Sequence, residues 1–239
     1  MPTQFYTLAD IQTILEEEAN PKTAGFLQSY FKTGPGQYGE GDLFRGIKVP
    51  VIRKIAQKAK DLAMDDLISL LNSSWHEDRL LALLVWVDRF DKANEDARTE
   101  IYRSYIDHSE RINNWDLVDL SAPNIVGGFL YENNRDILYK LVRSSNLWHR
   151  RIAMMATLYF IRNEDFSDTL SLAEILLNDD EDLIHKAAGW MLREIGKRNI
   201  IVEESLLKKH YKKMPRTMLR YAIERFPEKR RQAYLKGEI

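Results

Sequence analysis

Cysteine is absent from the 239-residue sequence, which also has only 7 prolines and 11 glycines. The lack of cysteine excludes disulfide bonds, thiolate metal sites and cysteine nucleophiles together. Long apolar runs are absent too, because a stretch such as 80–87 is far shorter than the ~18 residues of a membrane span. The first residues show no basic region followed by an apolar segment, as a signal peptide would. We expect a soluble, cytoplasmic protein with no membrane partner.

Neither positive nor negative charge is in excess, because the sequence has 35 Lys and Arg and 36 Asp and Glu, which give a formal net charge of −1. The halves differ, however: residues 1–120 carry 14 basic and 20 acidic side chains, whereas residues 121–239 carry 21 and 16. A basic half in a neutral protein is typical of polyanion binding. A solvated helical surface is the more ordinary explanation of charge alone, so both interpretations stay open.

The apolar residues follow a helical period almost everywhere. No segment alternates with a period of two between hairpin turns, which argues against strands. Apolar residues at i, i+3, i+4 and i+7 mark two of the helices: Leu80, Leu83, Leu84 and Val87, and Ile152, Met155, Ala156 and Tyr159. The sequence therefore predicts an all-α fold.

An internal repeat makes this fold prediction more specific. A basic residue opens an apolar helix at Arg79, Arg151, Lys186 and Arg220, with steps of about 72, 35 and 34 residues. The longest step divides into two, with an intermediate position near Trp115. A repeat of this length with a helix pair in each unit is typical of an α-solenoid. We predict one domain over 1–239, with irregular helices and a glycine-rich loop in 1–50 and regular repeats in 51–239.

The second helices of such repeats line one concave face, so the residues that open them should point into one basic groove. The candidates are Arg79, Arg150, Arg151, Lys186 and Arg193. Trp190 lies between the last two at helical spacing, and a cationic, aromatic stripe of this kind suits nucleic acid. Gly189 precedes Trp190 and would let a backbone or a ligand come close. Burial in the core is the alternative for Trp190 and the common outcome for tryptophan elsewhere.

The segment 33–42 contains four glycines but lacks the Gly-Lys-Ser/Thr ending and the preceding strand of a phosphate-binding loop. We therefore reject a nucleotide site and expect close backbone approach here, plausibly to a ligand backbone. The five histidines show no metal-binding spacing, and no nucleophile elbow is present. We predict neither a metal site nor a cofactor.

The most unusual stretch is 113–119 (NNWDLVD), which has two carboxylates where the other repeats have a basic residue. On a helix Trp115 and Asp119 share a face, whereas Asp116 is turned by about 100°. A lone carboxylate in a basic, aromatic trough repels phosphate but would stabilise a developing cation. The alternative is that Asp116 or Asp119 caps the helix and Trp115 is buried, with Asp116 the better capping candidate.

The sequence resembles the AlkD-type alkylpurine DNA glycosylases, which are built from HEAT-like repeats. The resemblance covers roughly residues 20–225 and rests on 115–119 (WDLVD), 146–153 (NLWHRRIA), 184–194 (IHKAAGWMLRE) and the region from 30–33 (YFKT) to 46–50 (GIKVP). It implies hydrolysis of the N-glycosidic bond of cationic N3- or N7-alkylated purines in double-stranded DNA. A DNA repair protein would associate with the nucleoid in a prokaryote.

Carried over by position, the resemblance makes Asp119 the catalytic carboxylate. Trp115 and Trp190 would pack against the deoxyribose of the lesion, Arg151 would hold a nearby phosphate, and Tyr30 would be an aromatic near the lesion. The family often has a second aromatic before the Trp115 position, where this chain has Asn114. The further DNA-binding residues predicted are Arg150, Lys186, Arg193 and Lys48.

An alkylated purine is already a cationic leaving group, so one carboxylate that stabilises an oxocarbenium-like sugar and orients water would suffice. We expect a monomer without lyase activity, because no activated amine stands out. Two alternatives stay open: a noncatalytic repeat scaffold and a catalytically silent DNA-binding relative. The presence of Asp119 with Trp115 and Trp190 favours the enzyme.

Overall fold

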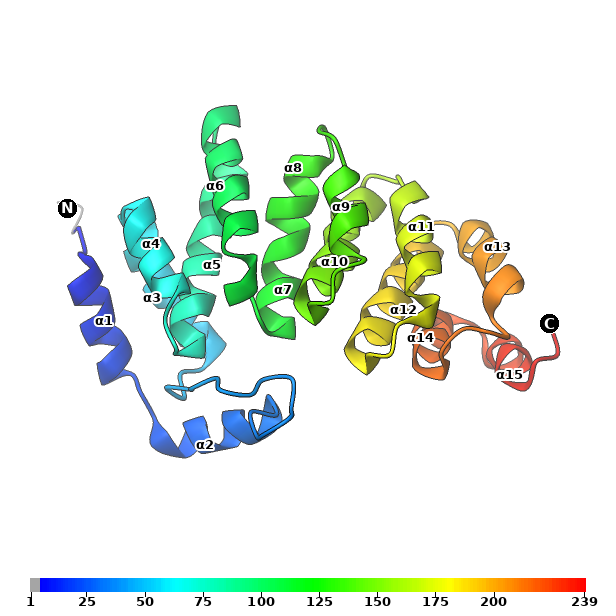
Figure 1. Ribbon diagram of the computed structural model, residues 1–239, viewed down its shortest axis with the longest axis horizontal. Coiled ribbons are helices and arrows are strands. Elements are labelled where there is room, and N and C mark those ends of the chain that lie inside the picture. The colour runs from blue at the N-terminus through cyan, green and yellow to red at the C-terminus, as the bar shows by residue number, and fades with distance from the viewer. Residues whose placement is uncertain (1–4) are drawn as a thin grey trace. The chain divides into compact units, whose positions relative to one another are not determined.

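A computed structural model describes residues 5–239 and contains helices joined mostly by short connections, with one long loop between residues 30 and 49 (Figure 1). Within this range no strand occurs, and the only β-type pairing is an isolated bridge between Leu43 and Trp75. The predicted all-α fold is confirmed. In the same range no helix is both long and apolar enough to cross a membrane. The prediction that no signal peptide is present falls largely on residues 1–4, which lie outside the described residues.

The chain divides into two compact units, Met1–Ser121 and Ala122–Ile239. In the first unit, α5 packs against α3 and α4, and the indole of Trp86 on α5 is fully buried. The helices of this unit are α1 (Leu8–Glu17), α2 (Pro21–Tyr30), α3 (Val49–Lys58), α4 (Met64–Leu71), α5 (His76–Lys92), α6 (Glu95–Asp107) and α7 (Trp115–Ala122), with 3-10 turns at Ala59–Asp61 and Ser109–Arg111.

In the second unit alternate helices pack side by side. A π-helical segment, Pro123–Gly127, contacts α10, α10 contacts α12, and α12 contacts α14. The helices here are α8 (Gly128–Leu130), α9 (Asp136–Leu141), α10 (Leu147–Arg162), α11 (Ser167–Ile175), α12 (Asp182–Gly196), α13 (Ile200–His210), α14 (Arg216–Ala222) and α15 (Glu228–Lys236), with 3-10 turns at Leu176–Asn178 and Ile223–Arg225.

Gly189 sits where α12 crosses α14. A Cβ atom at this position would lie 2.4 Å from the carbonyl oxygen of Met218 and 2.6 Å from Cβ of Tyr221. The close approach that the sequence predicted at Gly189 is therefore made by a neighbouring helix of the protein itself.

The repeat helices begin three or four residues before the basic residues that were expected to open them. In α10 a local cap fixes the earlier start, because the side chain of Asn146 accepts a hydrogen bond from the Trp148 amide at 2.8 Å, whereas α5, α12 and α14 begin without a side-chain cap. As a result, the fifth helical position is Arg151 in α10, Lys186 in α12 and Arg220 in α14. In α7 the same position is Asp119.

The glycine-rich loop folds onto its own unit. A Cβ at Gly46, where φ is +82°, would lie 2.1 Å from the carbonyl oxygen of Asn20, and one at Gly39 would lie 2.6 Å from that of Phe31. The buried carboxylate of Glu77 in the first turn of α5 accepts hydrogen bonds from the Gly46 and Ile47 amides at 2.8 and 3.1 Å. At Gly39 the close approach is thus to the protein's own backbone, which corrects the expectation of a ligand backbone at that position; Gly46, just after the segment 33–42, makes the same kind of contact.

Candidate active site

Trp115, the first residue of α7, is only partly buried. Together with Phe26, Tyr30 and Phe31 it forms a cluster of rings that we call the aromatic wall. Phe31 stacks on it with ring centroids 5.4 Å apart and planes inclined by 23°. Tyr30 meets Trp115 edge-on at 6.3 Å and stacks on Phe26 at 6.2 Å. Tyr30 and Phe26 remain 56% and 67% exposed, which is unusual for aromatic rings unless they serve a binding surface. The alternative of a fully buried Trp115 is not what the structure has.

Asp119 lies one helical turn after Trp115 and is also partly exposed. The charge of Asp119 acts on the side chain of Tyr105, which is fully buried. The Tyr105 hydroxyl lies 3.0 Å from the Ser121 hydroxyl. Burial raises the pKa of Tyr105, and the charge of Asp119 raises it further, against the hydrogen bond with Ser121. The carboxylate therefore stands at the edge of a dry interior in which charge is poorly screened.

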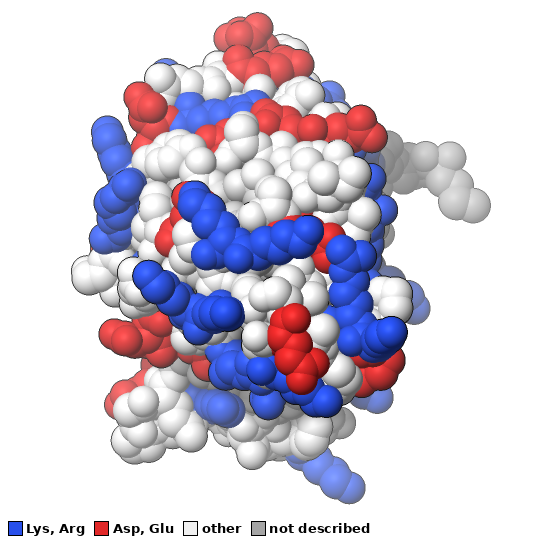
Figure 2. All heavy atoms as spheres, turned by 90° about the vertical axis from the view of Figure 1, so that its right-hand side faces the viewer, with Lys and Arg blue, Asp and Glu red and all other residues white. Residues whose placement is uncertain are grey.

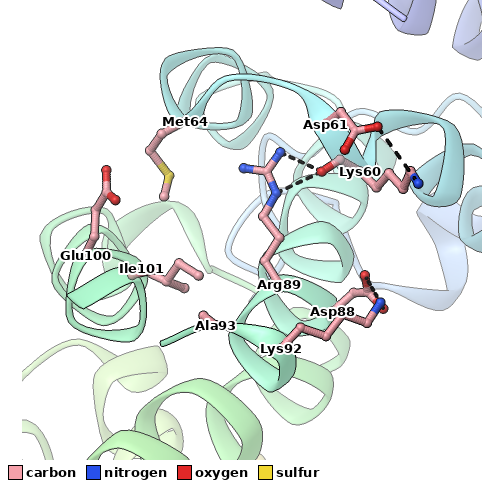
Figure 3. Close-up of a pocket in the computed structure, with 10 residues that line it drawn as sticks. Lys60, Asp61, Met64, Asp88, Arg89, Lys92, Ala93, Glu100 and Ile101 are labelled. Carbon is pink, nitrogen blue, oxygen red and sulfur yellow. Dashed lines mark hydrogen bonds and ion pairs between the residues drawn. The ribbon is translucent and has the colours of Figure 1, made fainter. Parts of the chain in front are cut away.

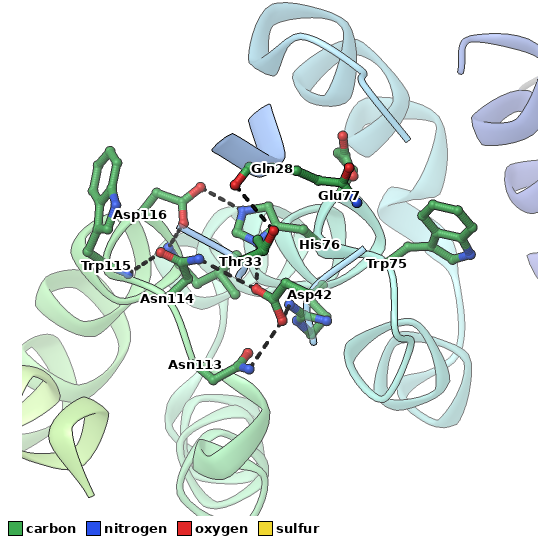
Figure 4. Close-up of polar contacts among 12 residues, drawn as sticks. Gln28, Thr33, Asp42, Trp75, His76, Glu77, Asn113, Asn114, Trp115 and Asp116 are labelled. Atoms are coloured by element: carbon green, nitrogen blue, oxygen red, sulfur yellow. Dashed lines mark hydrogen bonds and ion pairs between the residues drawn. The ribbon is translucent and has the colours of Figure 1, made fainter. Parts of the chain in front are cut away.

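A buried ionic network joins the start of α7 to the glycine-rich loop (Figure 4). Its centre is His76, which is 2% exposed, with Nε2 2.8 Å from Asp116 Oδ2 and Nδ1 3.5 Å from Asp42 Oδ2. Arg79 pairs with Asp42 Oδ1 at 2.7 Å. The Nδ2 amide of Asn114, the residue before Trp115, donates to Asp42 at 3.5 Å. Four charged groups, two of each sign, thus share one enclosed space.

The network determines the protonation of its members. Burial lowers the pKa of His76, but the charge of Asp116 and the contacts with both carboxylates raise it to about 9. Burial raises the pKa of Asp42, yet the contact with His76 and the charge of Arg79 hold it below its usual value. At neutral pH the imidazole is therefore a cation between two carboxylates.

Sequence reasoning missed His76 and Asp42 and assigned Asp116 only a capping role. Asp116 does accept a hydrogen bond from the Leu117 amide at 2.9 Å with one oxygen, while its other oxygen binds His76. The Trp-His pair at 75–76, repeated at 148–149, was the available signal. Spacing alone could not reveal that a loop residue 34 positions earlier, Asp42, reaches the same histidine.

Several predicted cations are engaged inside the protein. Arg79 was expected on a basic surface, but it is 1% exposed and neutralises Asp42, so that prediction was wrong. In the second unit Arg151 is 4% exposed and donates through Nη1 to the carbonyl oxygen of Leu183 at 2.5 Å. Arg150 pairs with Asp179 at 2.6 Å and also donates to the carbonyl oxygen of Ser144.

The predicted stripe on α12 is partly accessible. Lys186 pairs with Asp182 at 2.7 Å, one turn earlier, and Arg193 pairs with Glu224. Between them Trp190 is neither buried nor fully exposed, and its Nε1 donates to Glu194 at 3.2 Å. The core alternative for Trp190 therefore does not hold, whereas Trp86 and Trp148 are buried as expected and Trp75 lies half-exposed beneath Arg45.

The sequence matches the model of the family described as DNA alkylation repair enzyme over residues 11–226. The chain belongs to this family. A search of curated proteins found no match. Among solved structures the fold is similar to a predicted DNA alkylation repair enzyme from Enterococcus faecalis (17% identity, 88% of this chain, 98% of that one, TM-score 0.68). It is also similar to smu.31 from Streptococcus mutans UA159 (16% identity, 90% and 95% covered, TM-score 0.52).

Family membership gives a DNA repair enzyme that acts on alkylation damage, as the resemblance implied. The repair enzyme carries its strongest positive charge at the C-terminal end of the second unit. Residues 208–236 contain 11 Lys and Arg but only two acidic residues, and Figure 2 shows such side chains gathered on the face that bears α13 to α15. Most of these cations are exposed, so this face would attract DNA phosphates.

Two pockets of the first unit bear comparison with the predicted site, one without any residue of the aromatic wall and one lined by Phe31. A cavity of about 450 Å³ is crossed by Arg89, which donates to the carbonyl oxygen of Lys60 at 2.8 and 3.0 Å, and none of the predicted site residues lines it (Figure 3). A smaller apolar pocket of about 300 Å³ is lined by Phe31, His76 and Lys48. Among residues 5–239, no group of three or more His, Asp or Glu could hold a metal ion.

Proposed function

We propose that this repair enzyme is a DNA N-glycosylase that hydrolyses the N-glycosidic bond of cationic N3- or N7-alkylated purines in duplex DNA. The observation that carries the proposal is the carboxylate of Asp119 at the helical position where α10, α12 and α14 have cations. It stands one turn from the half-exposed Trp115 and its aromatic wall. A carboxylate beside aromatic faces favours a positively charged reacting centre.

In the proposed reaction the bond between C1′ and the purine nitrogen breaks, and its electron pair leaves with the base. The alkyl group has already made the base cationic, so no acid has to protonate the leaving group. Asp119 stabilises the oxocarbenium-like sugar, orients the attacking water and accepts the proton that the water loses. Because Asp119 borders the buried Tyr105, its charge acts in a weakly screened region.

Aromatic residues would hold the sugar in place. Trp115 is the proposed deoxyribose contact, with Tyr30 beside it, and the resemblance gives Trp190 on α12 the same role. An indole face near a cationic centre contributes roughly 0.5–2 kcal/mol. Asn114 stands in place of a second aromatic. Its side chain donates a hydrogen bond to Asp42 and accepts one from the Trp115 amide at the start of α7.

Basic residues would bind the phosphates. Lys48 and Lys186 are the more accessible candidates among those that the sequence predicted. The side chain of Arg193 is 16% exposed and would have to leave Glu224. Arg151 would have to exchange its bond to the Leu183 carbonyl for a phosphate oxygen, and Arg150 would have to leave Asp179. The proposed enzyme is a monomer and lacks a lyase step, so it leaves an intact abasic strand.

Chromatography of the bases released from methylated duplex DNA tests the proposal. The native chain should liberate 7-methylguanine or 3-methyladenine above the spontaneous rate, and unmethylated DNA should release nothing. Strand breaks should appear only after alkali treatment. If the native chain released no base, the glycosylase proposal would be wrong, and salt-sensitive DNA binding without release would favour a silent relative.

A further inference from the structure

We infer that His76 is a positioning residue for the proposed glycosylase site, because it holds the start of α7, and with it Trp115 and Asp119, against the aromatic wall. The inference rests on the proposed function for its consequence, but its geometry is independent of any reaction. His76 itself belongs to α5 and lies beneath the wall.

The surroundings favour a doubly protonated ring. Nε2 lies 2.8 Å from Asp116 Oδ2 of α7 and is hydrogen-bonded to it, whereas Nδ1 lies 3.5 Å from Asp42 Oδ2 of the loop, an ion-pair distance without a hydrogen bond. Two ionised carboxylates, which only accept hydrogen bonds, thus flank the ring. Arg79 of α5 also faces this space and pairs with Asp42, and the charge of Arg111 acts on Arg79 in turn. Lys48 and Glu77 line the same pocket as His76 and Asp116, while Phe31 and Phe44 contribute uncharged rings.

Two routes connect His76 to Trp115. One is polar: Asp116, which directly follows Trp115, receives the His76 proton on one oxygen and the Leu117 amide proton on the other, which fixes the first turn of α7. The other is aromatic: Phe31 contacts the His76 ring at 5.0 Å and the Trp115 ring at 5.4 Å. Asp119 follows on the next turn of the same helix, so any shift of that first turn moves the carboxylate.

Loss of the imidazolium proton would leave two carboxylates, Asp42 and Asp116, beside a single cation, Arg79, and hence one uncompensated negative charge beneath the wall. The start of α7 would then move away from the ring stack. Positioning errors of about 1 Å can lower a reaction rate by about 100-fold without removing any reacting group. Neither His76 nor its ionic partners belong to the exposed cations that would bind DNA, so binding should change little.

The variant test compares His76→Gln with His108→Gln, a matched control in which a histidine at the end of α6, with Nδ1 2.9 Å from the Ser104 carbonyl oxygen, is replaced. Excision of 7-methylguanine from a duplex is measured in single turnover with saturating enzyme, together with Kd for the duplex. We expect His76→Gln to lower the excision rate about tenfold or more, with Kd within about twofold of native and His108→Gln unchanged. Native-like excision by a folded His76→Gln would overturn the inference.

The pH profile separates positioning from simple stability. The native rate should hold up to pH about 9 and fall above it, as the imidazolium loses its proton. In Asp116→Asn the fall should move to lower pH, because the main group that raises the pKa of His76 is gone. A profile that stays in place in Asp116→Asn would contradict the inference.

A spectroscopic measurement on the native chain needs no activity. The ring nitrogen resonances of His76 and the indole signal of Trp115 are followed by NMR from pH 6 to 10. Movement of the Trp115 signal with the midpoint of His76 supports the inference even if no base is released, in which case only the proposed function fails. A Trp115 signal that does not shift as His76 titrates overturns the inference.

Discussion

At the scale of single residues, Glu203 shows most clearly how burial controls charge in this protein. It is 1% exposed, and Oε1 has no hydrogen-bond partner. Burial, and then the charge of the adjacent Glu204, raise the pKa of Glu203 to about 8. The carboxyl packs so closely on Gly196 that a Cβ there would lie 1.7 Å from Oε2. At neutral pH the Glu203 carboxyl is therefore protonated and packs as a neutral buried group, and its ionisation destabilises the fold.

Glu203→Gln should stabilise the protein above pH about 5. Below pH 4.5 the group is protonated in both folded and unfolded chains, so the variant and native proteins should match. Between pH 4.5 and 8 the unfolded chain ionises while the folded one does not, which lowers the stability of the native protein only. The free energy of unfolding, from urea titrations at pH 4.5 and 8, should favour the variant by roughly 1–4 kcal/mol at pH 8. A gain that is equal at both pH values would contradict this account.

The residues of the candidate site were predictable to different degrees. Trp115 and Asp119 could be proposed from the sequence, because their helical spacing and the carboxylate in place of a basic residue are both visible within a few neighbouring residues. Asp42 and His76 do not, because their pairing joins a loop and a helix start that are 34 residues apart. Arg79 was misjudged for the same reason: its position in the repeat was clear, but its buried partner Asp42 was not.

At the scale of elements, helix packing depends on small residues at crossings. The sequence predicted the helices and their order, but it placed their starts three or four residues late, because each helix begins about one turn before the basic residue that marks the repeat. It identified Gly189 as a point of close approach but could not decide between a ligand and another helix. The Cβ distances to Met218 and Tyr221 give α14 as the neighbour.

Gly189→Ala should therefore destabilise the protein although alanine is the better helix former. Overpacking against the α14 backbone costs roughly 1–3 kcal/mol and outweighs the propensity gain. Gly25→Ala is the matched control, because Gly25 lies in α2 and a Cβ there meets nothing within 4 Å. The control should gain about 0.5–1 kcal/mol. Thermal unfolding of both variants measures this, and a stable Gly189→Ala would refute the packing argument.

At the scale of the whole molecule, charge is distributed unevenly although the net charge is only −1. The excess of cations in residues 208–236 was detectable from the sequence as a basic second half. Its concentration on the face that bears α13 to α15 required the fold (Figure 2).

Replacing Lys212, Lys213 and Lys229 by glutamine should weaken duplex binding and lower its dependence on salt. Each phosphate contact that is lost reduces the slope of log Kd against log salt by up to about one. The same three lysines changed to arginine keep the charge and should bind like the native protein. Fluorescence anisotropy at several salt concentrations measures the slopes, and an unchanged slope in the glutamine variant would mean that this face does not contact DNA.

The central claim is that Asp119 is the carboxylate of a glycosylase, and the single-turnover excision rate of Asp119→Asn tests it most directly. The substrate is a duplex with one 7-methylguanine, and the native chain is compared under identical conditions. Removal of one group that stabilises the transition state typically costs about 100-fold or more in rate. We predict a loss of that size, with duplex affinity and thermal stability close to native. Excision by Asp119→Asn within about threefold of the native rate would contradict the account.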